Sequence, residues 1–143
     1  PPDELRLIIA IPDFVLATKV SRSVLPESVD LSTTVFNMSR SSLLVAAMAT
    51  GDLDLLPVSM EDRLHQPYRV KLIPGFEEVR RNALEAGALS IALSGAGPTV
   101  VAYARASAPI QQIATQMALA FQQNGLACQT QILTVDTEGA KVN

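Results

Sequence analysis

The sequence predicts an α+β fold in which four antiparallel strands form one sheet that carries helices on one face. Two observations predict it. Four short segments are rich in branched apolar side chains, and segments with helical spacing separate the first from the second and the third from the fourth. With right-handed crossovers, this order is that of a split βαβ or ferredoxin-like sandwich with extra helices inserted in the first crossover.

The composition supports one folded domain and excludes several classes of partner. Hydrophobic residues make up 48% of the 143 residues, which suits a single packed core. The net charge of -3 gives no broad attraction to nucleic acid or to anionic membrane, because both require concentrated Lys and Arg. No apolar run is long enough to span a bilayer. The single Cys128 cannot form an internal disulfide, so we expect a cytoplasmic protein.

The first strand and a long helix occupy the first third of the chain. Leu5–Ile11 is rich in branched side chains and is followed by Pro12, which predicts a buried strand. A short helical turn is predicted within 14–29. The long helix is capped by Asp30 or Ser32 and extends to about residue 50, where Gly51 stops it. Its apolar residues are spread around the circumference, which predicts burial on more than one side: Val35, Met38, Leu43, Val45 and Ala46.

The remaining elements complete the predicted order. A shorter helix is expected over 52–64, and apolar residues at helical spacing predict another helix between Pro74 and Gly87. Its charged residues, among them Glu77 and Arg80, are expected to face solvent. The last elements are the strands Leu89–Leu93 and Thr99–Ala104, a helix from Ile110 that ends before Gly125, and the strand Ala127–Val135. The positive mean hydropathy of +0.26 favours a partner on part of this surface.

A glycine-rich turn between the two central predicted strands is the most informative stretch. Two glycines allow positive φ and leave amide hydrogens unshielded, so the turn can form a nest for phosphate oxygens. It lacks the third glycine of the dinucleotide fingerprint and the Lys of a P-loop. A tight hairpin without a functional role is the alternative. The turn consists of Ser94, Gly95, Ala96, Gly97 and Pro98.

Other residues offer only partial sites. Arginine can bind a carboxylate or phosphate through two parallel hydrogen bonds, but spacing alone does not choose among Arg22, Arg40, Arg63 and Arg69. Thr18 lies four residues before Arg22, close enough on a helical turn to share a site with it.

The single histidine, His65, lacks partners for a metal site or a catalytic triad, so a structural or merely exposed role is expected. We expect Cys128 to be an inert buried thiol, and Asp52 and Asp54 to favour a helix start.

Three separated motifs resemble those of the GHMP kinases, the family that acts on galactose, homoserine, mevalonate and phosphomevalonate. The run 93–99, Leu-Ser-Gly-Ala-Gly-Pro-Thr, is similar to the third conserved motif of that family. Two further runs are most similar to the members that phosphorylate homoserine. They are Ile11-Pro12 followed by Thr18-Lys19-Val20-Ser21-Arg22 and Val24-Leu25-Pro26, and the run 66–74, Gln-Pro-Tyr-Arg-Val-Lys-Leu-Ile-Pro.

The resemblance implies transfer of the γ-phosphoryl group of ATP to the hydroxyl of L-homoserine, with Mg²⁺, on the route to threonine. Residue by residue, it assigns Thr18, Arg22 and Arg69 to homoserine binding, with the two arginines suited to the carboxylate. It implies positioning and charge neutralisation rather than a strong side-chain base. It also implies that a turn near the transferred phosphate helps to shape the site: Ser94, Gly95, Ala96 and Gly97.

The family's nucleotide loop and its acidic Mg²⁺ ligand belong to an N-terminal domain that these residues do not include. The chain opens at Pro1 without Met, so we expect it to be a piece of a longer protein. The resemblance implies that residues 1–143 are a C-terminal domain, inactive alone, whose partners are its N-terminal domain and a second copy in a homodimer. Two alternatives stay open. One is another GHMP kinase, of the mevalonate or diphosphocytidyl-methylerythritol type, and the other is a non-catalytic ferredoxin-like module that binds an amino acid.

Overall fold

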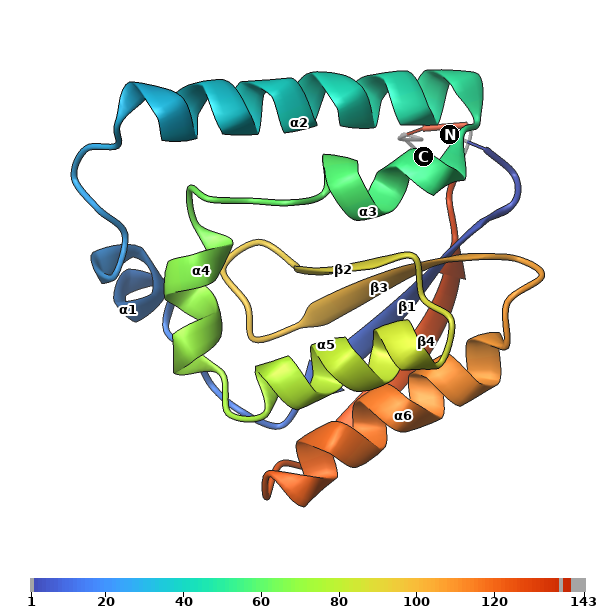
Figure 1. Cartoon of the computed structure of the whole chain (residues 1–143). Coiled ribbons are helices and arrows are strands. Elements are labelled where there is room, and N and C mark those ends of the chain that lie inside the picture. The colour runs from blue at the N-terminus through green and yellow to red at the C-terminus, as the bar shows by residue number, and fades with distance from the viewer. Residues whose placement is uncertain (1, 137, 140–143) are drawn as a thin grey trace.

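Four strands form a single antiparallel sheet in the order β2-β3-β1-β4 (Figure 1). The computed structural model describes residues 2–136 and 138–139, so Pro1 and the last residues of the predicted domain lie outside the described residues. The first strand pairs with both the third and the fourth, which is the predicted split βαβ arrangement. The strands are β1 (Leu5–Pro12), β2 (Ser90–Leu93), β3 (Val100–Arg105) and β4 (Cys128–Thr134).

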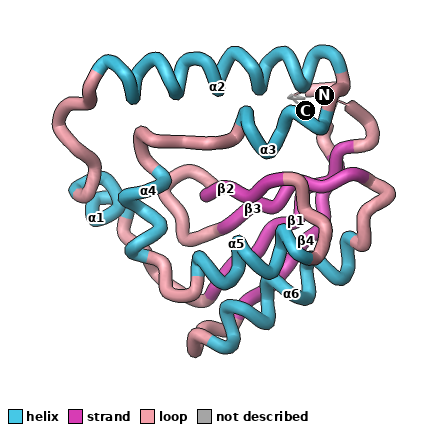
Figure 2. The backbone as a smooth tube through the Cα atoms, viewed as in Figure 1, coloured by secondary structure: helices cyan, strands magenta, loops and turns pink. Residues whose placement is uncertain are grey.

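Two helices, α5 and α6, lie side by side on one face of the sheet (Figures 1 and 2). Alternate β3 residues face them and are fully buried, namely Val100, Ala102 and Ala104. The predicted sheet with helices on one face is confirmed, with extra helices inserted between β1 and β2. The helical elements in chain order are α1 (Thr18–Ser23), α2 (Leu31–Thr50), η1 (Leu53–Leu55), α3 (Leu56–Ser59), α4 (Gln66–Arg69), η2 (Val70–Leu72), α5 (Phe76–Glu85) and α6 (Ile110–Gln123).

A second, smaller apolar cluster closes one end of the sheet. Leu5 at the start of β1 is buried with Leu53 and Leu56, and Leu44 and Met48 of α2 pack against them. The long helix α2 extends from this end, beside α3, to the opposite end, where α1 lies (Figure 1). The cluster therefore anchors only the C-terminal half of α2.

The limits of α2 are as predicted, but its burial is not. Asp30 accepts a hydrogen bond from the Thr33 amide, and bonds from Ser32 and Thr33 lower the pKa of its carboxyl to about 2. Gly51 ends the helix with a φ of 79°. Ala47 is the buried residue of this helix. The prediction of burial on several sides was wrong, because α2 packs along one side on η1 and α3 and leaves other apolar side chains exposed: Val35, Met38 and Val45.

Two further predictions need correction, and two short elements were missed. The helix expected over 52–64 ends at Ser59. The amides of Met60 and Glu61 still bond to carbonyls of α3, but those of Leu64 and Gln66 bind the Asp62 carboxylate instead of continuing a helix. The short elements α4 and η2 were not predicted. Cys128 lies at the start of the edge strand β4 and is half-buried rather than buried, and this burial raises the pKa of its thiol. Within the described residues, no helix is long and apolar enough to cross a membrane.

Candidate functional site

The turn between β2 and β3 has the predicted hairpin geometry. The Ser94 amide donates to the Thr99 carbonyl at 2.8 Å, and the Gly97 amide donates to the Ser94 carbonyl at 3.1 Å. Gly95 and Gly97 have φ values of 60° and 80°, in the region where a side chain is strained. An added Cβ on Gly97 would lie 2.9 Å from Cδ1 of Ile73, whereas one on Gly95 would meet nothing within 4 Å. The composition of the turn thus follows from its backbone.

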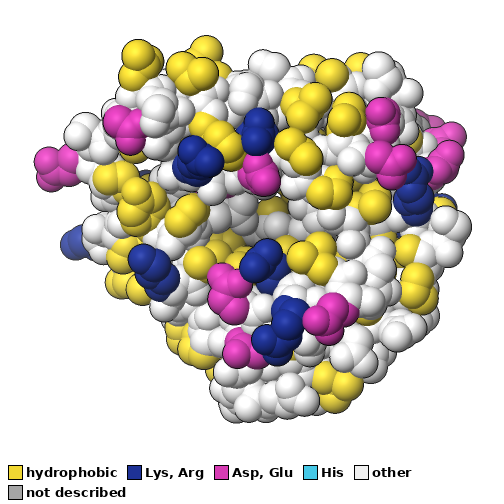
Figure 3. Space-filling model, in the orientation of Figure 1, with side chains coloured by type: hydrophobic (Ala, Val, Ile, Leu, Met, Phe, Trp, Pro, Cys, Tyr) yellow, Lys and Arg dark blue, Asp and Glu magenta, His cyan; other side chains and the backbone are white. Residues whose placement is uncertain are grey.

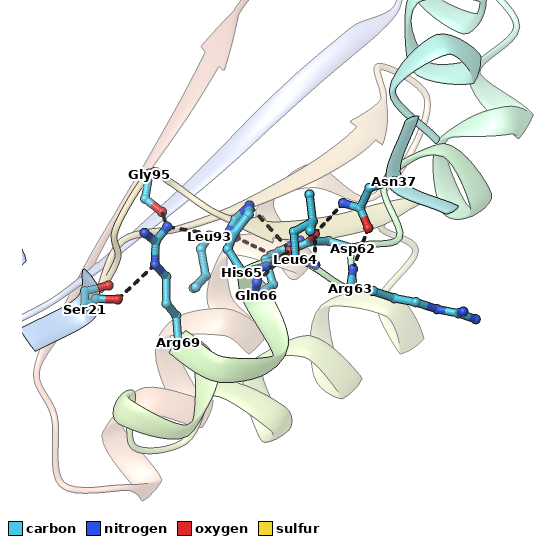
Figure 4. Close-up of polar contacts among 10 residues, drawn as sticks. All are labelled: Ser21, Asn37, Asp62, Arg63, Leu64, His65, Gln66, Arg69, Leu93 and Gly95. Atoms are coloured by element: carbon cyan, nitrogen blue, oxygen red, sulfur yellow. Dashed lines mark hydrogen bonds and ion pairs between the residues drawn. The ribbon is translucent and has the colours of Figure 1, made fainter. Parts of the chain in front are cut away.

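Two carbonyls of this turn are tied to distant segments of the chain, and Figure 4 shows the contact at Gly95. The hydroxyl of the buried Ser21, on α1, donates to the Ala96 carbonyl at 2.8 Å. Arg69, at the end of α4, donates from Nη1 to the Gly95 carbonyl at 3.2 Å and from Nε to the Ser21 carbonyl at 3.2 Å. The turn, α1 and α4 therefore meet at one end of the sheet.

The amides of the turn remain available to a ligand. Among the described residues, the Gly95 and Ala96 amides have no hydrogen-bond partner. The carbonyls of the same two residues accept hydrogen bonds from Arg69 and Ser21. Successive amides that are free and point to one side can bind an anion. This geometry is compatible with the predicted phosphate nest.

The structure brings some of the predicted site residues together. Thr18 and Arg22 are both exposed on α1 and lie one helical turn apart. Arg69 contacts the backbone of Ser21, the residue next to Arg22, so both arginines belong to the same end of the molecule. Within the described residues, no hydrogen bond uses Nη2 of Arg69, so its two donors are free for a ligand.

The other two candidate arginines lie elsewhere. The guanidinium groups of Arg40 and Arg63 stack on the ring of Phe36, at 4.2 and 3.7 Å from its centre. Arg40 also forms an ion pair with Glu61 at 2.8 Å. These contacts tie α2 to the segment 61–63, whereas Arg69 contacts the glycine turn.

A buried carboxylate that the sequence reasoning missed organises the start of α4 (Figure 4). The Asp62 side chain is only 7% exposed. Its oxygens accept hydrogen bonds from Nδ2 of Asn37 at 2.6 Å and from three backbone amides, those of Leu64, His65 and Gln66, at 2.7, 3.1 and 2.6 Å. Burial acts to raise the pKa of this carboxyl, but these hydrogen bonds prevail and lower it. An acidic residue shortly before Gln66-Pro67 was the available signal, since Pro favours a first helical turn.

His65 lies between this carboxylate and Arg69. Its Nε2 is 3.4 Å from Oδ2 of Asp62, and its Nδ1 is 3.4 Å from Nη1 of Arg69. The side chain is 40% exposed. The next residue, Gln66, accepts a hydrogen bond from the Leu93 amide at 2.9 Å, which fixes α4 against the edge of β2.

A hollow of about 440 Å³ lies beside α4 and is lined in part by Asp62 and Gln66. Its walls are mostly apolar and come from α3, α4, α5 and β2, and it is visible near the centre of the face shown in Figure 3. None of the residues predicted for homoserine or phosphate binding lines it. The candidate site therefore remains the sheet end formed by α1, α4 and the glycine turn.

A comparison with models of protein families shows which family this chain belongs to. The family model described as "GHMP kinases C terminal" matches residues 44–123. The chain belongs to this family. The matched region includes α4 and the glycine turn, and the resemblance predicted from the motifs is confirmed.

Individual GHMP relatives agree with this assignment. Proteins named homoserine kinase from Moorella thermoacetica and Persephonella marina are 50% and 43% identical over 141 residues, which is 99% of this chain and 47% and 46% of theirs. The crystal structure of homoserine kinase from Cytophaga hutchinsonii superposes on this structure with a TM-score of 0.90 and 34% sequence identity. The match covers 94% of this chain and 42% of that chain. The chain thus spans about half the length of the curated relatives it matches.

Proposed function

We propose that this chain is the substrate-binding, C-terminal part of a kinase that transfers the γ-phosphoryl group of ATP to the hydroxyl of L-homoserine, a step on the route to threonine. The observation that carries the proposal is the meeting of α1, Arg69 and the glycine turn at one end of the sheet. Relatives named homoserine kinase that match 99% of the chain support this substrate over mevalonate.

In this proposal the two arginines bind the homoserine carboxylate. Arg69 uses Nε and Nη1 for contacts within the protein and keeps Nη2 for the substrate. Arg22 is exposed on the neighbouring helix, and the Thr18 hydroxyl lies one turn away as a further polar contact. Two guanidinium groups around one carboxylate provide charge and orientation, which place the homoserine hydroxyl for an in-line transfer.

The glycine turn is proposed to lie near the transferred phosphoryl group. The unpartnered amides of Gly95 and Ala96 offer hydrogen bonds to phosphate oxygens, and Ser94 and Gly97 shape the turn that presents them. Because phosphoryl transfer proceeds through a loose transition state, such positioning and charge stabilisation contribute more than a strong base.

ATP and Mg²⁺ are assigned to another part of the enzyme. Within the described residues, no group of three or more His, Cys, Asp or Glu side chains is arranged to hold a metal ion. We propose, as the sequence predicts, that an N-terminal domain binds ATP and Mg²⁺, that residues 1–143 form one C-terminal domain, and that this domain alone is inactive. Mg²⁺, when bound, would neutralise phosphate charge.

Two further parts of the proposal concern assembly and location. The exposed apolar side chains of α2, among them Val35, Met38 and Val45, support association with a second copy or with the N-terminal domain. Size-exclusion chromatography with light scattering tests the homodimer, and a monomeric intact enzyme would contradict it. A cytoplasmic location is inferred from the biosynthetic role and from the single cysteine.

The site assignment is tested in the intact enzyme with Arg22→Ala. Loss of a charged hydrogen bond is expected to lower kcat/KM for homoserine roughly tenfold to a thousandfold, with the KM for ATP unchanged. Arg81→Ala, which removes an exposed arginine on α5, is the matched control and should leave both constants unchanged. Unchanged homoserine kinetics in the Arg22 variant would contradict the assignment, and phosphorylation of mevalonate but not homoserine would contradict the substrate.

A second experiment tests the division of labour between the domains. Purified residues 1–143 are expected to turn over no ATP, and to bind homoserine weakly at most. A coupled assay measures ATP turnover, and calorimetry measures the binding of homoserine. ATP hydrolysis by this chain alone would overturn the assignment of nucleotide binding to another domain.

A further inference from the structure

The ring of His65 connects a fixed carboxylate to the arginine assigned above to the substrate (Figure 4). We propose that His65 is a positioning residue, whose Nδ1 holds the guanidinium plane of Arg69 in the orientation that presents Nη2 to the homoserine carboxylate. This inference rests on the proposed function, because it takes Arg69 as a substrate-binding group.

Asp62 provides the fixed point of this arrangement. Its carboxylate is anchored by Asn37 of α2 and by three backbone amides, including that of His65 itself. A side chain with four such partners cannot rotate without breaking several hydrogen bonds at once. Its Oδ2 lies 3.4 Å from Nε2 of His65, so a hydrogen on Nε2 faces an anion and the lone pair is left on Nδ1.

Arg69 lies at the other side of the His65 ring, next to Nδ1. Nη1 carries two hydrogens, one of which is donated to the Gly95 carbonyl, and Nδ1 of His65 lies 3.4 Å from the same nitrogen. Together with the bond from Nε to the Ser21 carbonyl, these contacts fix three directions within the guanidinium plane. Only Nη2 then remains free, and its direction is set by the plane. Loss of the Nδ1 contact would remove one of the two contacts at Nη1 and leave the guanidinium group held by the carbonyls of Gly95 and Ser21 alone.

A role in core packing does not account for this histidine. Its ring is 40% exposed, and the described contacts of its two nitrogens are with charged side chains rather than with the apolar core. The start of α4 depends on the His65 backbone amide, which donates to Asp62 whatever side chain is attached. Replacing the ring should therefore change the orientation of Arg69 much more than the stability of the fold.

Two variants of the intact enzyme separate positioning from structure. His65→Leu removes the acceptor, and His65→Asn keeps an oxygen acceptor near the position of Nδ1. We expect His65→Leu to raise the KM for homoserine about tenfold, which is the scale of one hydrogen bond to a charged group. The KM for ATP and the Tm should be unchanged. His65→Asn should restore most of the affinity for homoserine.

Each outcome bears on one of the two proposals. If Arg69→Ala raises the homoserine KM but His65→Leu does not, the positioning role is overturned and the proposed function stands. If Arg69→Ala leaves that KM unchanged, the proposed substrate site itself fails. Equal losses of Tm in both His65 variants would indicate a structural role and overturn the inference. Should His65→Leu not fold, His65→Ala also removes the acceptor, and a wild-type homoserine KM in that variant would overturn the positioning role. In the Arg69→Ala background, His65→Leu should add nothing.

Discussion

The two long helices α6 and α2 are both rich in apolar residues, but α6 is buried against the sheet and α2 is largely exposed. Of the 14 residues of α6, five are buried, and Ile113, Met117 and Phe121 form a stripe against the sheet. In the 20 residues of α2, Ala47 is the one buried residue. The difference shows that apolar residues within a helix do not indicate which of its faces packs against the rest of the protein.

Polar contacts compensate for the missing apolar face of α2. Asn37 donates to the Asp62 carboxylate at 2.6 Å and accepts from the Arg63 amide at 3.0 Å. Arg40 is paired with Glu61 at 2.8 Å. At its C-terminal end, Leu44 and Met48 pack on the small cluster around Leu56. The segment that holds α2 is thus also the segment that carries Asp62 and leads into α4, so the support of the long helix and of the candidate site is shared.

The largest effect is expected where α6 meets the sheet. Phe121→Ala removes a fully buried ring and should lower the free energy of unfolding by about 3–5 kcal/mol. Leu119→Ala, on the exposed side of the same helix, is the matched control and should cost far less. Urea unfolding followed by circular dichroism measures both. Equal losses would show that the two faces of α6 do not differ.

Leu56→Ala tests the apolar support of α2. Leu56 is fully buried in the small cluster, and its truncation should cost about 2–4 kcal/mol because a cavity remains between α3 and α2. Val58→Ala changes an exposed residue of the same helix and serves as the control. Amide hydrogen exchange is expected to increase first in the C-terminal half of α2. An increase confined to α6 would contradict this support.

Asp62→Ala tests the polar support and carries a pH signature. The loss of the carboxylate leaves backbone amides of 64–66 unpaired and should cost about 1–3 kcal/mol at pH 7. Because folding lowers the pKa of this carboxyl, its stabilisation is complete above the unfolded value, about 3.9, and is lost as the pH falls through the folded value. The difference between wild type and variant in urea unfolding should therefore begin to narrow as the pH falls below about 4. Asp54→Ala, with its carboxylate 81% exposed, is the control, and an equal effect there would contradict the role of Asp62.

The smallest effect is expected on the outer face of α2. Val35→Ser and Met38→Ser alter side chains that are 56% and 64% exposed, so each should change the free energy of unfolding of the dilute chain by less than about 0.5 kcal/mol. A larger loss in dilute urea unfolding would show that this face is covered within the chain. A loss that appears only in the intact enzyme or at high concentration would instead indicate an interface there.

Much of the fold follows from local patterns. The strand of branched residues at Leu5, the Asp30 cap, the Gly51 stop and the helix between Pro74 and Gly87 each depend on neighbours in sequence, and the structure confirms them. The site is different. Thr18, Arg22 and Arg69 could be assigned only through a resemblance between motifs, since an isolated arginine gives no signal that separates it from Arg40 or Arg63.

Two features were beyond the reach of local patterns. Asp62 is one carboxylate among many until Asn37, which lies 25 residues earlier, and the amides of the next turn converge on it. His65 lacks sequence neighbours that mark it as part of a site, and its position between Asp62 and Arg69 is set by the short helix α4, which the periodicity did not indicate.

By itself the sequence determined the α+β order of elements, their approximate ends and, through the motifs, the family. These depend on backbone preferences and on apolar periodicity, which act over a few residues. The tertiary structure alone decided that α5 and α6 would cover the sheet while α2 stayed largely exposed, and that Ser21, Arg69 and the glycine turn would meet. Such contacts join residues 26 to 75 positions apart, and the packing of whole elements determines which of them form.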